Sequence, residues 1–130
     1  MSHFSKIKVK IHDEECLLKA LDDLGYRYEC GGEIRGFGGR RMRVDIAIPQ
    51  EGGYDIGFLR EGEEFQMVAD LWGLKVDKDE FIQQVNQRYA YHVVLKQAKT
   101  QGFKVVEEQQ AEDGTIRLIC EREEEVEAVS

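Results

Sequence analysis

A glycine-rich stretch from residue 31 to residue 43 carries side chains well suited to bind an anion. It holds five glycines and one glutamate, together with candidate ligand or partner contacts at Arg35, Phe37, Arg40, Arg41 and Arg43. Glycine lets backbone N–H groups turn toward a phosphate, arginine matches phosphate oxygens, and a phenylalanine ring can stack on a base. The stretch lacks a P-loop motif and no helix start follows it, which excludes the P-loop and the dinucleotide-binding turn. The alternative is a hairpin connection whose arginines pair with acids.

A second group of candidate contacts lies on a predicted helix. Arg88, Tyr91 and His92 share a face beside the apolar stripe of that helix and could bind a ligand or a partner. The alternative is a structural role, because tyrosine commonly packs its ring and keeps its hydroxyl in water.

Three aspartates are the candidates for a catalytic role. Asp45, Asp55 and Asp70 fall on the polar phase of neighbouring predicted strands, where a cluster of carboxylates could hold a divalent metal for hydrolysis. Cross-strand ion pairs explain the same pattern. No nucleophile set of the Ser-His-Asp or Cys-His type is evident. We therefore expect a protein that is not an enzyme and that has no metal site and no cofactor.

The elements that must position these residues follow from periodicity. Alternating apolar and polar residues predict strands over residues 6–11, 26–30, 42–48, 54–58, 65–71, 103–105 and 116–120. Apolar residues at helical spacing predict helices over 14–24 and 80–101, with Asp13 and Asp77 as N-caps.

Each predicted helix ends in a glycine and an aromatic residue that lead into a strand, which suggests two related halves. We predict an α+β fold in the order β-α-β-β-β-β-α-β-β, an antiparallel sheet of about seven strands with two helices on one face and water on the other. Two half-sheets, each with its own helix, are the alternative. Val68, Trp72 and Val106 fall on the wet phase and suggest a homodimer through a sheet edge or face.

Size and charge narrow the function classes. A chain of 130 residues predicts one domain, over residues 1–122, followed by an acidic, frayed tail at 123–130. The net charge of −8 repels nucleic acid and anionic membranes, so that nucleic acid could bind only through the 31–43 stretch. Three cysteines without a CxxC motif, no signal peptide and no long apolar run predict a cytoplasmic protein without membrane contact.

Three ordered blocks carry a family resemblance: MSHFSKIK at 1–8, GYDIGF at 53–58, and QRYAYH at 87–92 continuing through QGF at 101–103 to DGTIRL at 113–118. With these blocks the chain resembles the conserved hypothetical chloroplast reading-frame thirty-five family, a domain of unknown function found in plastid genomes and cyanobacteria. It departs from that family in a shorter connection at 71–77 and in its acidic tail. The resemblance implies a stand-alone soluble protein of the cytosol, or of the plastid stroma if plastid-encoded, that serves a larger assembly.

Two functional hypotheses follow. The first is a non-enzymatic accessory or adaptor protein that acts through a protein partner, because the catalytic set is absent and the arginine-rich stretch contrasts with the acidic C-terminus. The second is a phosphate-recognising module that binds nucleotide or RNA through residues 31–43.

Overall fold

The computed structural model describes residues 4–123, and the chain divides into two compact units. Unit 1 spans Met1–Tyr89 and unit 2 spans Ala90–Ser130. The single domain over residues 1–122 stays a prediction. The predicted tail at 123–130 lies, apart from Glu123, outside the described residues.

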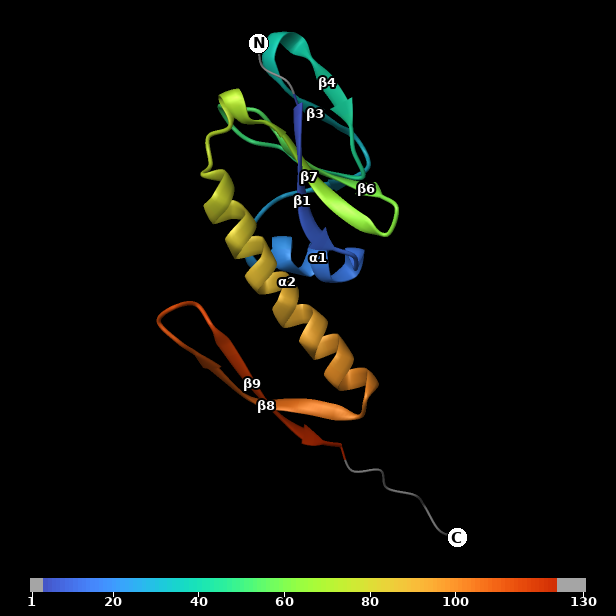
Figure 1. The fold of residues 1–130 in the computed structure, drawn as a ribbon, viewed down its shortest axis with the longest axis vertical. Helices are drawn as coiled ribbons and strands as arrows, with labels where there is room; N and C mark the ends of the chain where they lie inside the picture. The colour runs from blue at the N-terminus through green and yellow to red at the C-terminus, as the bar shows by residue number, and fades with distance from the viewer. Residues whose placement is uncertain (1–3, 124–130) are drawn as a thin grey trace. The chain divides into compact units, whose positions relative to one another are not determined.

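Unit 1 combines antiparallel strands with helices, which confirms the α+β class (Figure 1). Its main sheet has the order β1-β7-β6-β5-β2, with β1 (Phe4–Ile11), β7 (Glu64–Asp70), β6 (Ile56–Glu61), β5 (Ile46–Ile48) and β2 (Glu29–Cys30). A separate hairpin pairs β3 (Glu33–Arg35) with β4 (Arg41–Arg43) around the 3-10 turn η1 (Phe37–Gly39). Helix α1 (Glu14–Asp23), the 3-10 turn η2 (Leu71–Gly73) and the first part of helix α2 (Lys78–Thr100) complete the unit.

The strands within residues 4–123 form three sheets instead of one sheet of about seven strands. The predicted strand at 42–48 divides at Val44 and Asp45, whose backbone N–H groups donate to Gly32 and Phe58. The segment before the break pairs within the β3–β4 hairpin and the segment after it pairs within the main sheet. The chain therefore leaves one sheet and enters another, a change that an unbroken alternating pattern does not reveal.

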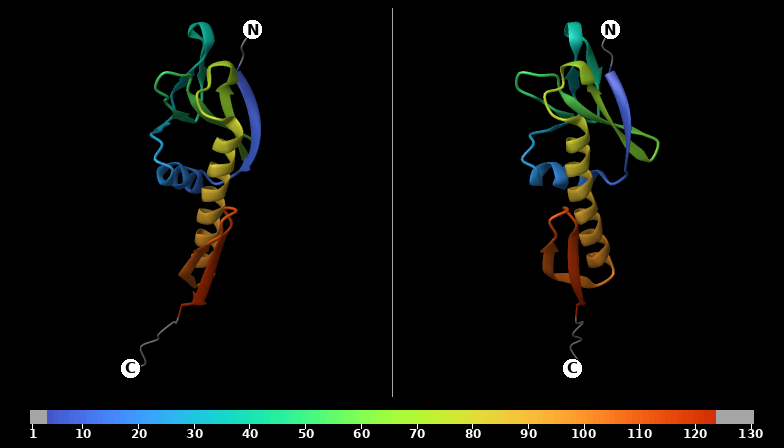
Figure 2. Two further views of the ribbon diagram at one scale, coloured as in Figure 1. Left: turned by 90° about the vertical axis from the view of Figure 1, so that its left-hand side faces the viewer. Right: turned by 60° about the vertical axis from the view of Figure 1, so that its left-hand side comes forward.

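Both faces of the main sheet are covered, although the sequence predicted one wet face. On one face, α1 and α2 pack on the same core, with Leu17 and Leu21 from α1 and Phe81 and Val85 from α2. On the other face, Ile34 of the β3–β4 hairpin and Val44, which directly follows it, pack with Ala47 and Val68 in a second core. Val68, predicted to be exposed, is fully buried there, whereas Trp72 and Val106 are exposed. Figure 2 shows the hairpin, in teal, at the end of unit 1 where β1 begins.

Gly57 on β6 makes this second core possible, and we expect Gly57→Ala to destabilise the protein by about 1–3 kcal/mol through overpacking. A Cβ at this position would lie 2.8 Å from Val44 Cγ1 and 3.2 Å from Ile34 Cγ2. Urea denaturation followed by circular dichroism would measure the loss. Adding Val44→Ala should reopen the space, so the double variant should lose less stability than the sum of the two single variants. Strict additivity would contradict this packing.

Local signals define both helix starts and the turn after α1. Asp13 caps α1 by accepting from Cys16 N at 3.0 Å, and Asp77 accepts from Glu80 N at 3.0 Å at the start of α2. After α1, Gly25 adopts a positive φ of 79° and Tyr26 N donates to Leu21 O, which is the Schellman arrangement. Gly102 follows α2 with a φ of 82°. The repeated helix-glycine-aromatic pattern is thus confirmed at both turns.

Unit 2 contains the end of α2 and the antiparallel pair of β8 (Phe103–Gln110) and β9 (Ile116–Arg122). None of the described residues of this unit, 90–123, is buried. The strands that follow the two glycines also differ. β2 has two residues and joins the main sheet, whereas β8 has eight residues and, within residues 4–123, pairs only with β9.

Candidate functional site

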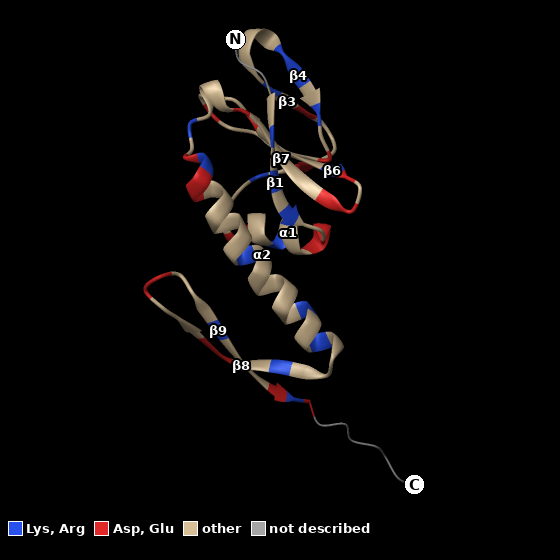
Figure 3. Ribbon diagram, in the orientation of Figure 1, with Lys and Arg blue, Asp and Glu red and all other residues tan. Residues whose placement is uncertain are grey.

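The β3–β4 hairpin sorts its side chains by face. Its antiparallel register places Arg35 opposite Arg41 and Glu33 opposite Arg43. The intervening pair, Ile34 and Met42, belongs to the second core, so the charged pairs face outward. Figure 3 shows the resulting basic residues, in blue, on the hairpin. Four arginines and Glu33 give residues 31–43 a charge of +3 in a chain of −8.

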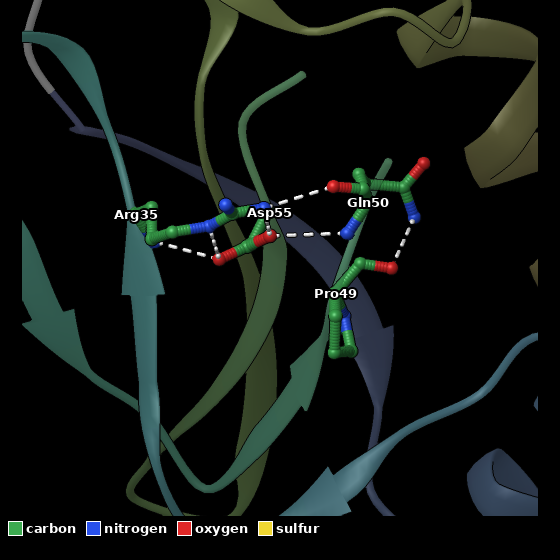
Figure 4. Close-up of polar contacts among 4 residues, drawn as sticks. All are labelled: Arg35, Pro49, Gln50 and Asp55. Carbon is green, nitrogen blue, oxygen red and sulfur yellow. Dashed lines mark hydrogen bonds and ion pairs between the residues drawn. The ribbon is translucent and has the colours of Figure 1, made fainter. Parts of the chain in front are cut away.

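A buried carboxylate holds Arg35 (Figure 4). Asp55 is 4% exposed, and its Oδ2 and Oδ1 accept from Arg35 Nε and Nη2, each at 2.9 Å. It also accepts from the backbone N–H of Arg35 at 2.9 Å and of Gln50 at 3.0 Å. Arg35 Nη2 donates in addition to the Gln50 carbonyl at 2.8 Å. The network ties the hairpin to the loop before β6.

These bonds decide the ionisation of both groups. Burial raises the pKa of Asp55. Hydrogen bonds from the Arg35 side chain and from the backbone N–H groups of Gln50 and Arg35, together with the charge of Arg35, lower this pKa by more, so the net pKa is lowered. The hydrogen bonds and charge of Asp55 in turn raise the pKa of Arg35. The pair is therefore ionised at neutral pH.

A second buried carboxylate, Asp70, fixes two exposed aromatic residues. Its Oδ2 accepts from Phe37 N at 3.0 Å and its Oδ1 from Trp72 N at 3.1 Å, while Asp70 itself is 1% exposed. Phe37 and Trp72 remain 50% and 80% exposed, and Leu71 is exposed as well. We call Phe37, Leu71 and Trp72 the aromatic face.

A pocket of about 220 Å³ lies in the same region and is lined by Arg35, Gly36, Gly39, Arg40, Arg41, Gly53 and Tyr54. We call it the arginine pocket. Glycine is required around it for close packing. A Cβ at Gly36 would lie 2.8 Å from the Phe4 ring, and a Cβ at Gly73 would lie 2.2 Å from the Tyr54 ring. The walls of the pocket are therefore packed against β1 and η2.

A second pocket, of about 420 Å³, is lined by Arg27, Tyr28, Glu29, Pro49, Gln50 and Glu51. It has two carboxylates and one guanidinium, so it favours a cation or a neutral polar group over an anion. The sequence gave no signal for this pocket, because its two segments are about 20 residues apart and neither carries a motif.

The three candidate aspartates of unit 1 accept hydrogen bonds from different donors. Asp55 binds Arg35, Asp70 binds the backbone at Phe37 and Trp72, and Asp45 accepts from Arg60 N at 2.7 Å. Within residues 4–123, no three His, Cys, Asp or Glu side chains come together as a metal site would require. In this arrangement the aspartates act as acceptors for backbone and arginine donors.

The other candidate contacts are distributed over both units. Arg35, Arg40 and Arg41 come together in the arginine pocket, which does not include Phe37 and Arg43. In unit 1, Arg88 forms an ion pair with Asp23 at 2.9 Å. In unit 2, the Tyr91 hydroxyl donates to Glu108 Oε2 at 3.0 Å, and its ring meets that of His92 edge to face. Their role in binding stays a prediction.

The sequence interpretation missed that Phe37 and Trp72 donate to the same carboxylate, that of Asp70, and that Tyr54 lines the pocket. One signal was available, because Asp70 accepts from an N–H two residues ahead, which is the bond of an Asx turn. That signal would have ended the fifth strand at Asp70 and left Leu71 and Trp72 in a turn. The bond from Phe37 spans 33 positions, and no local pattern predicts it.

Comparison with known proteins identifies relatives along nearly the whole chain. A family model described as a protein of unknown function, DUF1257, matches residues 20–119. The uncharacterized protein ycf35 of Cyanophora paradoxa is 38% identical over 125 residues, covering 94% of this chain and 98% of that protein. The ycf35 protein of Guillardia theta is 40% identical with the same coverage, and that of Pyropia yezoensis is 35% identical over 129 residues. No solved structure matches. Among the described residues, no helix is long and apolar enough to cross a membrane.

Proposed function

The chain belongs to the DUF1257 family, which includes the ycf35 proteins of plastid-bearing organisms, and from this premise we propose that it is a non-enzymatic accessory protein that docks on an acidic protein partner. The family resemblance read from the sequence is thereby confirmed. The names of the relatives carry no activity, so the support for the proposed role comes from the surface of unit 1.

One observation carries the proposal: the aromatic face is exposed and yet held in place. The backbone N–H groups of Phe37 and Trp72 both donate to the buried carboxylate of Asp70. An aromatic residue whose backbone is already ordered loses less conformational entropy on binding. Tryptophan, tyrosine and arginine are also the residues most enriched among those that dominate binding energy at protein interfaces. The aromatic face with the neighbouring arginines and Tyr54 has this composition.

Charge indicates the kind of partner. Residues 31–43 carry +3 while the chain carries −8, so an acidic partner is attracted to the hairpin and repelled elsewhere on the molecule. The partner we propose therefore presents an apolar cavity for Trp72 with acidic side chains around it. We propose that the protein acts in the stroma where it is plastid-encoded and in the cytoplasm elsewhere, which its relatives in plastid-bearing organisms support.

We expect Trp72→Ala to weaken partner binding about 30-fold, which corresponds to about 2 kcal/mol, the threshold of an interface hot spot. Tagged wild-type protein and the variant would be used to isolate binding proteins from the native cell, and the affinity of each purified candidate would then be measured. Val94→Ala is the matched control, because Val94 is also an exposed apolar residue but lies in unit 2.

A partner that contains an acidic, apolar surface and loses affinity with Trp72→Ala but not with Val94→Ala supports the proposal. Equal affinity for all three proteins contradicts it. A homodimer in sedimentation that Trp72→Ala dissociates would assign the aromatic face to a second copy of the chain and would also contradict an acidic partner.

A further inference from the structure

Beyond docking on a partner, we propose that the arginine pocket binds the phosphate group of a small ligand. The inference shares Arg35, Arg40, Arg41 and Tyr54 with the surface proposed for docking, but it requires no protein partner, because it concerns the pocket that these residues line and not the aromatic face. The comparisons assign no ligand to this site.

The charge of the pocket wall is the first reason. Among the residues that the structure describes, the pocket is lined by three arginines and by no acidic residue. Arg35 and Arg41 stand directly opposite each other in the β3–β4 pair, where like charges destabilise an antiparallel ladder. Both carboxylate oxygens of Asp55 are directed to Arg35. Within residues 4–123, Arg41 has no ion pair. Asp55 thus offsets the charge of Arg35 but not that of Arg41. A bound anion would reduce the repulsion that remains between the two arginines.

The second reason is that Asp55 preorganises the site. Its two bonds to the side chain of Arg35, together with the bond from Arg35 to the Gln50 carbonyl, hold the guanidinium in one orientation. Even so, the Arg35 side chain remains 51% exposed. An arginine that is already ordered loses less conformational freedom when it binds an anion. Phosphate offers several oxygens to such a cluster and carries a charge of about −2 at neutral pH, so it matches arginine forks better than chloride does.

Size decides between a phosphate group and a larger ligand. The pocket of about 220 Å³ is smaller than the roughly 300–1,000 Å³ of typical sites for drug-sized ligands. It therefore suits a phosphate group, with the rest of the ligand lying outside. Tyr54 at the wall offers a ring against which that part could pack. The larger pocket contains Glu29 and Glu51 and would repel the same ligand. A long polyanion such as RNA would also meet the −8 charge of the chain.

Calorimetric titration of the full chain at low salt tests the inference with three probes: inorganic phosphate, ATP and a short RNA. We expect binding of phosphate or ATP at about 1 mM or tighter and about a tenfold loss with Arg41→Gln. Arg43→Gln is the control, because Arg43 lies on the same strand and the same face and loses the same charge, but does not line the pocket. The affinity of Arg43→Gln for phosphate or ATP should remain within about twofold of wild type, since this variant changes only a longer-range attraction that salt screens.

Comparing the affinities for ATP and for inorganic phosphate shows whether the phosphate group belongs to a nucleotide or to the free anion. Tighter binding of ATP than of phosphate assigns the site to a nucleotide, and equal binding assigns it to the free anion. Both support the inference. Three results would overturn it: no binding of either probe, equal losses in the two arginine variants, or RNA as the tightest ligand. Trp72→Ala should leave phosphate binding unchanged, so failure here is distinguishable from failure of partner docking.

Discussion

We expect Asp55→Ala to lower the free energy of unfolding by about 2–4 kcal/mol, because it removes the acceptor of four hydrogen bonds at once. Two of the donors are the backbone N–H groups of Arg35 and Gln50, which have no other acceptor in the network. The Arg35 side chain is half exposed, so water can solvate its charge and most of the cost arises from the backbone donors. Urea denaturation at neutral pH would measure the loss.

The same residue predicts a dependence on pH. The folded-state pKa of Asp55 is lowered, so its ionised form stabilises the fold, and that contribution is fully present above the unfolded pKa of about 3.9. It is lost as the pH falls through the folded pKa. The difference in stability between wild type and Asp55→Asn should therefore be constant near pH 7 and should narrow below about pH 4. A difference that stays constant into acid would contradict the assigned pKa direction.

Asp45→Ala is the matched control for Asp55→Ala. Asp45 also accepts from a backbone N–H, that of Arg60, but it is exposed and has no ion pair among the described residues. Its loss should cost about 1 kcal/mol or less. Equal losses at Asp45 and Asp55 would show that the Arg35 network adds no stability. A stable Asp55→Ala variant that still binds phosphate normally would show that Asp55 does not preorganise the arginine pocket.

Phe81→Ala has the other large expected effect, a loss of about 3–5 kcal/mol. Phe81 is almost fully buried on α2 and contacts two other aromatic rings. Its ring centroid lies 5.3 Å from that of Tyr26, edge to face, and 6.3 Å from that of Phe58. Truncation would leave a cavity between the helix and the sheet and would remove both ring contacts. Circular dichroism should follow the unfolding, because the single tryptophan, Trp72, is already exposed in the folded protein.

Val94→Ala on the same helix is the control, and it should change stability by about 0.5 kcal/mol or less because Val94 is exposed. If Phe81→Ala cost no more than Val94→Ala, the packing of α2 on the main sheet would be wrong. If Phe81→Ala abolished folding altogether, the milder Phe81→Leu, expected to cost about 1–2 kcal/mol, would still measure the contact.

The helices and their ends were predictable because their signals are local. Asp13 caps α1 through a residue three positions ahead, and Asp77 caps α2 in the same way. Glycine after each helix takes the positive φ that other residues avoid. The candidate arginines were also found from the sequence, since a cluster of charge on a glycine-rich stretch is itself a local property. Such signals depend on interactions between residues that are close in the sequence, so they do not depend on the tertiary structure.

The covering of the main sheet was not predictable in the same way. Alternation on β6 and β7 reports which residues share a face, but it does not say whether that face meets water or another element. Val68 looked like an exposed apolar residue until the β3–β4 hairpin was seen to cover it. The hairpin can approach because Gly57 has no side chain, and Ile34 of the hairpin together with Val44, which directly follows it, closes the second core.

Local order thus followed from the amino-acid sequence alone: the α+β class, the two capped helices, the glycine turns and the basic stretch at residues 31–43. The tertiary structure alone assigned the roles of the polar residues. It joined Arg35 to Asp55 across 20 positions and Phe37 to Asp70 across 33, and so formed the arginine pocket and the aromatic face. The physical reason is that a buried carboxylate is stable only where donors converge on it, and which donors converge is decided by the packing of distant strands.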